Sequence, residues 1–189
     1  MFDVPRPMVV LLALLSGCRG IGAPAASKAT DGTRLSLFAS AVPGQIDRLT
    51  AGASFPATAA ILTTFHNLGA RPVELLIFAI DDAGTVHWIA PGETSETPVT
   101  LPPQPRETPL PETVVLDELA AGPLRLLTVV ALQAPAVSVL RKLPAAALTT
   151  SALAAAYPEA AIEELQLIVR SPLKPTPPLT PPETPRPVR

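Results

Sequence analysis

The stretch "ELLIFAIDDAGTVHWIA", residues 74–90, decides the fold. Its first half is apolar at nearly every position, which is typical of a strand that is buried on both faces. Asp81 can start a turn by bonding to nearby backbone, and Gly84 can end it because glycine accepts the positive φ of a bulged hairpin. A second apolar strand follows at once. We therefore predict a β-hairpin over residues 72–90.

Shorter apolar stretches on both sides of this hairpin predict further strands. Those expected are an edge strand at 35–42, then 57–67, 112–119, 124–133 and 162–170. The stretch 124–133 is again apolar on both faces. The stretch 162–170 alternates apolar and polar residues, so one of its faces is expected to be exposed to solvent.

Two short helices are predicted between the last two strands. Pro135 suits the first turn of one, and residues 149–157 form the other, which Thr or Ser caps and Pro158 ends. Hairpin-like connections between most strands favour sheet-on-sheet packing over a βαβ sheet. The predicted fold is mainly β: an antiparallel, immunoglobulin-like β-sandwich of about six or seven strands, with a short helical excursion before the last strand.

Residues 91–111 hold seven prolines in 21 positions. No helix tolerates that density, and within a sheet only an edge strand does. The segment is expected to be a long surface excursion with residues 99–101 extended.

The N-terminus carries a different signal, an apolar run followed by the chain's only cysteine. Residues 8–15 read "MVVLLALL", about 12 Å of helix, which is too short for a hydrocarbon core of about 30 Å and typical of a signal peptide. Leu15-Ser16-Gly17-Cys18 comes next and resembles the lipobox of bacterial lipoproteins. The alternative is an ordinary secreted protein with one free thiol.

The lipobox resemblance implies cleavage between Gly17 and Cys18, a diacylglycerol on the Cys18 sulfur and an acylated new N-terminus. Several acyl chains together would make an effectively permanent membrane anchor. Arg19 is not the Asp that retains members of this family in the inner membrane. The resemblance therefore implies the outer membrane, with the domain facing the periplasm or the cell surface.

The predicted domain organisation has four parts. Residues 1–17 are the lipoprotein signal peptide, 18–34 a flexible tether, 35–171 the β-sandwich domain and 172–189 a disordered tail. The tail holds eight prolines in 18 residues and is expected to be a disordered, protease-resistant extension in polyproline II conformation; the alternative is a spacer or docking peptide.

Composition excludes some classes of function. The formal net charge is −2 and no Lys/Arg cluster is present, so nucleic-acid binding is not expected. With one cysteine there is no intramolecular disulfide.

A looser resemblance covers residues 35–170. "LLIFAIDDAGTVHWIAP", then "LPETVVL" and "AGPLRLLTVVAL", looks like an envelope-associated bacterial domain of unknown function that occurs beside peptidases, kinases and regulatory modules. The resemblance implies a β-rich accessory or sensing domain and no reaction.

No residue pattern predicts catalysis, a metal site or a cofactor. The histidines, His66 and His87, lack a poised nucleophile such as G-x-S-x-G and a third zinc ligand. Asp81 and Asp82 lack the further oxygen ligands that calcium prefers, so a hairpin turn is the better interpretation. If the domain has an interaction surface, His87 and Trp88, beside the Pro-rich excursion, are the candidates.

The sequence thus predicts a lipid-anchored envelope protein that acts as a non-enzymatic accessory or scaffold module. Its expected partners are the membrane, through Cys18, and an envelope protein. The alternative is a binder of a small ligand or cell-envelope polymer, and a hydrolase with an unrecognised site is the last hypothesis.

Overall fold

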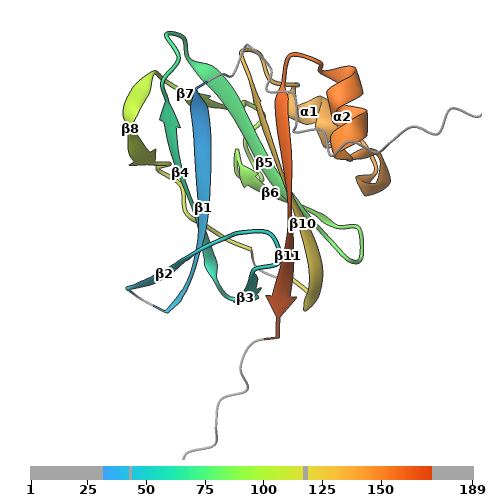
Figure 1. The fold of residues 1–189 in the computed structure, drawn as a ribbon. Helices are drawn as coiled ribbons and strands as arrows, with labels where there is room; N and C mark the ends of the chain where they lie inside the picture. Colours follow the sequence, from blue (N-terminus) through green and yellow to red (C-terminus); the bar gives the residue numbers. More distant parts are fainter. Residues whose placement is uncertain (1–31, 43, 117–118, 172–189) are drawn as a thin grey trace, which may run out of the picture.

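The computed structural model describes residues 32–42, 44–116 and 119–171, which form a β-sandwich with helices on one outer face (Figure 1). The predicted signal peptide, the tail and nearly all of the tether lie outside the described residues. No helix among the described residues is long and apolar enough to cross a membrane.

The centre of the molecule is the antiparallel pair β5 (Val73–Asp81) and β10 (Gly122–Ala131). Leu75, Ile77 and Ala79 of β5 point into the core between the two sheets. Leu76, Phe78 and Ile80 alternate with them and point into a second core under the helices. The prediction of strands covered on both faces is confirmed for β5 and β10.

The strands form two sheets, one of six strands and one of five. The six-stranded sheet runs β3 (Ser54–Pro56), β11 (Ala161–Arg170), β10, β5 and β6 (Val86–Ala90), and β7 (Val99–Leu101) also pairs with β5. The five-stranded sheet runs β2 (Gln45–Arg48), β1 (Thr33–Val42), β4 (Ala60–Asn67) and β8 (Gln104–Pro109), and β9 (Val114–Val115) also pairs with β4. All pairings are antiparallel except that of β11 with β3.

The helical excursion lies between β10 and β11, as predicted, and covers the outer face of the larger sheet (Figure 1). It consists of α1 (Val137–Leu140), the 3-10 turn η1 (Ala145–Ala147) and α2 (Thr150–Ala156). Thr149 caps α2 by accepting a hydrogen bond from the Ala152 N–H, and Pro158 follows its C-cap. The helix expected at Pro135 begins two residues later.

The predicted hairpin is present between β5 and β6. The Gly84 N–H donates to the Asp81 carbonyl at 3.0 Å, with Gly84 at φ 81°. The Asp81 carboxylate accepts from the Thr85 N–H at 2.7 Å. Asp81 and Gly84, the two residues from which the turn was predicted, therefore stabilise it.

The structure corrects three local expectations. β1 is an edge strand only at its start, because it pairs with β4 from Thr33 to Ser40 but with β2 only from Phe38 onward. The tether was expected to end at Arg34, but β1 starts at Thr33, so two of its residues belong to the sheet. The strand expected at 112–119 is reduced to Val114–Val115, since after these residues the backbone no longer pairs with β4.

Seven described strands have five or more residues, and the rest are short. The β-sandwich prediction is therefore confirmed, with short strands added along its rims. β8, from the Pro-rich excursion, contains Pro105 and Pro109 and pairs on one side only, with β4. Proline is tolerated there because the open side of an edge strand needs no donor.

One connection crosses from the smaller sheet to the larger one, between β2 and β3. Its Leu49 N–H donates to the Leu37 carbonyl of β1 at 2.8 Å, and its Gly52 N–H donates to the Gln166 carbonyl of β11 at 2.8 Å. Figure 1 shows this segment passing across one side of the sandwich, from β1 of the smaller sheet to β11 of the larger one. It covers only one half of that side.

Truncating the core between the sheets should destabilise the whole domain. Leu126 on β10 is 1% exposed, so Leu126→Ala should lower the free energy of unfolding by about 2–5 kcal/mol, because it removes buried methyl groups and leaves a cavity. Leu68→Ala is the control, since Leu68 is 61% exposed. Urea unfolding measures both, and equal losses would contradict the assigned core.

Candidate binding groove at the open sheet edges

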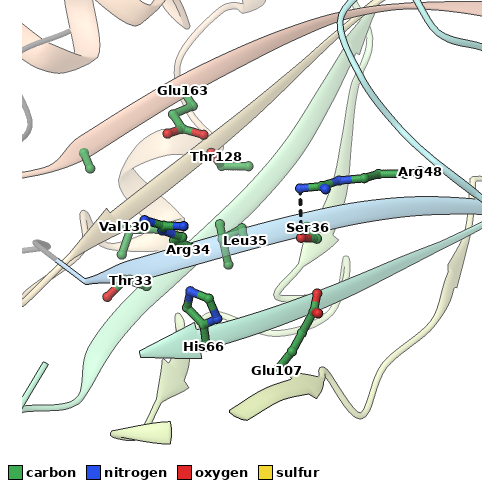
Figure 2. Close-up of a pocket in the computed structure, with 11 residues that line it drawn as sticks. Thr33, Arg34, Leu35, Ser36, Arg48, His66, Glu107, Thr128, Val130 and Glu163 are labelled. Atoms are coloured by element: carbon green, nitrogen blue, oxygen red, sulfur yellow. Dashed lines mark hydrogen bonds between the residues drawn. The ribbon is translucent and has the colours of Figure 1, made fainter. Parts of the chain in front are cut away.

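The half of the side that the crossing segment leaves uncovered contains a cavity. It measures about 490 Å³ and is lined by β1, β10 and β11, together with Arg48, His66 and Glu107 (Figure 2). A smaller cavity of about 130 Å³ adjoins it. The two share the residues Leu35, Ser36, Arg48, Thr128 and Glu163. We call the two together the edge groove.

Both long walls of the edge groove are open strand edges. On one wall, β2 pairs with β1 only from Phe38 onward, and Leu37 bonds to the crossing segment. Backbone groups of alternate residues point to the same side of a strand, so the N–H and C=O groups of Thr33 and Leu35 point to the same side as those of Leu37. That side has no pairing strand there among the described residues.

The opposite wall has the same character. β3 and the crossing segment bond to β11 at Gln166 and Ile168. By the same alternation, the backbone groups of Ile162 and Glu164 point to the open side. Two unpaired strand edges thus border one groove.

Charged side chains of both signs line the edge groove. Arg34 and Glu163 make no hydrogen bond or ion pair with any described residue. Arg48 donates from Nη2 to the Ser36 hydroxyl at 3.3 Å. Figure 2 shows Arg34 and Ser36 on β1, with Arg48 extending from β2 to Ser36. Glu163 lies on the other side of β1 from His66 and Glu107.

The carboxylate of Glu107 has a fixed partner on β4. The Thr64 hydroxyl donates to it, and this hydrogen bond, assisted by Ser36 and by the positive charge of Arg48, holds the pKa of Glu107 below its ordinary value. Glu107 is therefore an anion at neutral pH and offsets part of the charge of Arg48.

His66 contributes an unused polar atom. Its Nε2 is buried and has no hydrogen-bond partner among the described residues. A buried imidazole nitrogen without a partner is unfavourable, so a bound molecule that supplied a donor or acceptor there would be stabilised.

Ser36, His66 and Glu107 are the residue types of a hydrolytic triad, but their contacts differ from one. Ser36 accepts from Arg48, and Glu107 accepts from Thr64. No hydrogen bond joins His66 to Ser36 in the described chain, so the base and the nucleophile are not coupled.

The two residues predicted as an interaction surface, His87 and Trp88, lie elsewhere and are buried, at 8% and 6% exposure. His87 Nε2 lies 3.1 Å from the Asp81 carboxylate. Trp88 packs on Phe78 with ring centroids 5.2 Å apart, and the Arg141 guanidinium lies 5.2 Å above its ring. This corrects the expectation of an exposed surface, because the second core and α1 cover this strand; Trp88 reaches only a shallow cavity beside Arg141.

Glu163 and Glu164 are neighbours on β11 and point to opposite sides of the strand. Glu163 lines both cavities of the edge groove. Glu164 borders only the smaller cavity, forms an ion pair with Arg125 at 3.1 Å and accepts from the Thr150 hydroxyl at 3.0 Å. The hydrogen bond from Arg125 keeps the pKa of Glu164 below its ordinary value. This network ties α2 to the sheet and is structural.

Cys18 and Gly17 lie outside the described residues. Within the described chain, no cluster of three or more His, Cys, Asp or Glu residues is placed to hold a metal ion. The sequence did not single out the edge-groove residues Arg34, Ser36, Arg48, Thr128 and Glu107, because they are ordinary residues of separate strands. Of the edge-groove residues, the sequence drew attention only to His66, as one of its two histidines.

The comparisons with known proteins name no relative. No family model matches the chain, and neither a curated protein nor a solved structure matches it significantly.

The contact between Asp81 and His87 should make stability depend on pH. Burial alone raises the pKa of Asp81, but hydrogen bonds from His87 and the Thr85 N–H outweigh it, so the pKa lies below the ordinary value of 3.8. A lowered folded-state pKa stabilises the fold above the unfolded pKa, and this contribution is lost as the pH falls through the folded value. Asp81→Asn should cost about 1.5–3 kcal/mol at pH 7 and less at pH 2.

The matched control is Asp82→Asn, on the exposed neighbour in the same turn. Urea unfolding at pH 7 and pH 2 measures both variants. A loss for Asp81→Asn that is the same at both pH values would contradict the assigned role of the carboxylate.

Proposed function

We propose that this protein is a non-enzymatic accessory module that binds a partner protein through the edge groove and is held at a bacterial membrane by lipid on Cys18. The observation that carries the proposal is the pair of open strand edges, Thr33–Ser36 and Ala161–Leu165, that border one polar groove. Unpaired N–H and C=O groups in a row are a template for another chain, and folded proteins usually cover them.

Charged side chains at a sheet edge also prevent unwanted pairing between copies. Arg34 and Glu163 are suited to that purpose. Such protection, however, requires neither a cavity of about 490 Å³ nor a buried, unpartnered nitrogen on His66. These two features favour an occupied groove.

The anchor in the proposal rests on the lipobox residues Leu15 to Cys18 and on the apolar run before them. Arg19 favours the outer membrane, and export places the domain in the periplasm or at the cell surface. A bound lipid raises the local concentration of the module near other envelope proteins, which suits an accessory role.

Photocrosslinking in the native cells tests the binding role. Ser36 and Glu163 are each replaced by a photoreactive residue in the full chain. Arg106 on β8 and the exposed Val139 on α1 serve as control positions. We expect both groove positions, and neither control position, to form an adduct with the same protein.

Other results would overturn the proposal. Adducts from all four positions, or from none, would mean that the groove is not a docking site. An adduct of the groove positions with a cell-wall polymer would replace the proposal by the alternative, a polymer-binding module.

Replacing the cysteine tests the anchor. Cys18→Ser should abolish incorporation of labelled palmitate, because the acylated sulfur and the processed N-terminus are both lost. Ser16→Ala, which keeps a small residue, should retain the label. Mass spectrometry and radiolabelling of the purified chains measure both, and unchanged labelling of Cys18→Ser would contradict lipidation at this residue.

A further inference from the structure

We propose that the edge groove takes an extended acidic polypeptide strand, which pairs with the open edge of β1 and continues the position of β2 in the smaller sheet. The inference rests on the proposed function and specifies the chemistry of the partner segment. The open edge begins just beyond β2. Arg48, the last residue of β2, pairs with Phe38, Leu37 accepts from the Leu49 N–H, and Thr33 to Ser36 extend beyond this bond.

The backbone of this edge is already ordered for pairing. Its other side is held in register with β4 from Thr33 to Ser40. The Thr33 hydroxyl donates to the Asn67 carboxamide oxygen at 3.3 Å, and Asn67 in turn donates to the Arg71 and Leu101 carbonyls. On binding, the partner strand would lose conformational entropy, whereas β1 would lose little because it is already ordered. This favours strand addition.

The side chains on the outer face of β1 select for acidic residues. A strand added beside β1 places alternate side chains on that face, next to Arg34 and Ser36. Arg34 has no described partner, and Arg48 extends to the Ser36 hydroxyl from the side on which the strand would be added. Opposite charges on neighbouring strands attract, so glutamate or aspartate fits these positions.

The inward positions of the added strand meet a different surface. They face Leu35, Thr128 and Val130, with Glu163 on the far wall. Small apolar or β-branched side chains fit there, and Glu163 disfavours an acidic one by like-charge repulsion. The groove thus selects a strand in which apolar and acidic residues alternate.

The anionic residues of the groove do not cancel this preference. Glu107, on β8, is held by the Thr64 hydroxyl and interacts with Ser36 and Arg48, so it offsets part of the Arg48 charge but leaves Arg34 without a described partner. Along the competing edge of β11, the side chain of Glu164 is already paired with Arg125. The unpaired cation therefore lies on β1, and we assign the strand to that edge.

The test uses the full protein, isotope-labelled in detergent micelles, and short capped peptides. One peptide alternates valine and glutamate, and its matched counterpart alternates valine and lysine. In NMR titrations we expect the acidic peptide to shift the amide signals of Thr33 and Leu35 and to bind more tightly than the basic one. Equal binding of the two, no binding, or shifts confined to Ile162 and Glu164 would overturn the inference.

Two further measurements separate strand addition from simple charge attraction. Peptides N-methylated either at every valine or at every glutamate lose the hydrogen-bond donors along one edge only. One of the two should lose binding and the other should keep it. If neither methylation matters, the peptide does not add as a strand.

Arg34→Glu should weaken the acidic peptide about fivefold, the factor that corresponds to a cross-strand charge pair. Arg106→Glu makes the same change of net charge on β8 and should leave the affinity unchanged. Equal weakening by both variants would mean that the effect depends on net charge alone.

The peptide titrations and the crosslinking experiment separate the two proposals. If the peptide does not bind but the groove crosslinks persist, only the acidic strand is refuted. If the crosslinks are absent, the proposed function itself is refuted.

Discussion

The rest of the structure depends on the burial of both faces of β5 and β10. These two strands carry apolar side chains on alternate sides, one set in the core between the sheets and the other under α1 and α2. A strand with two apolar faces is unfavourable unless both are covered. The smaller sheet covers one face, and the helical excursion covers the other. The order of layers follows from this requirement.

The open edges follow from the same arrangement. The covering layers pack against the faces of the larger sheet. Burial of apolar area drives this packing, and that area lies on the faces of the sheet and not along its edges. The connection between β2 and β3 closes one half of the β1 and β11 side through its bonds to Leu37 and Gln166. The other half remains open, and polar residues gather there because water, or a bound chain, must satisfy the backbone groups.

The structure separates two kinds of polar cluster. Asp81 with His87, and Arg125 with Glu164 and Thr150, are satisfied within the domain and hold a turn and a helix in place. The edge groove instead contains Arg34, Glu163 and the Nε2 of His66, which have no partner in the described chain. The closed pairs stabilise the fold, whereas the edge groove leaves polar groups without a described partner around a cavity.

The sequence by itself determined the elements whose physics is local. The hairpin at Asp81 to Gly84 follows from turn chemistry, the doubly buried strands from unbroken apolar runs, and the caps of α2 from Thr149 and Pro158. Residues 112–119 misled because their apolar pattern suits a strand, whereas pairing with β4 needs a partner in register and ends after Val115.

The tertiary structure alone decided the candidate site. Arg34, Arg48 and Glu163 come from three strands that are far apart in the sequence, and they meet because the sandwich brings β1 beside β11. It also decided that Trp88 is covered, since the helix that packs on it follows some fifty residues later. The periodicity of the sequence indicates which face of a strand is apolar. Which edge stays unpaired depends on contacts between segments that are distant in the sequence, and local sequence does not determine those contacts.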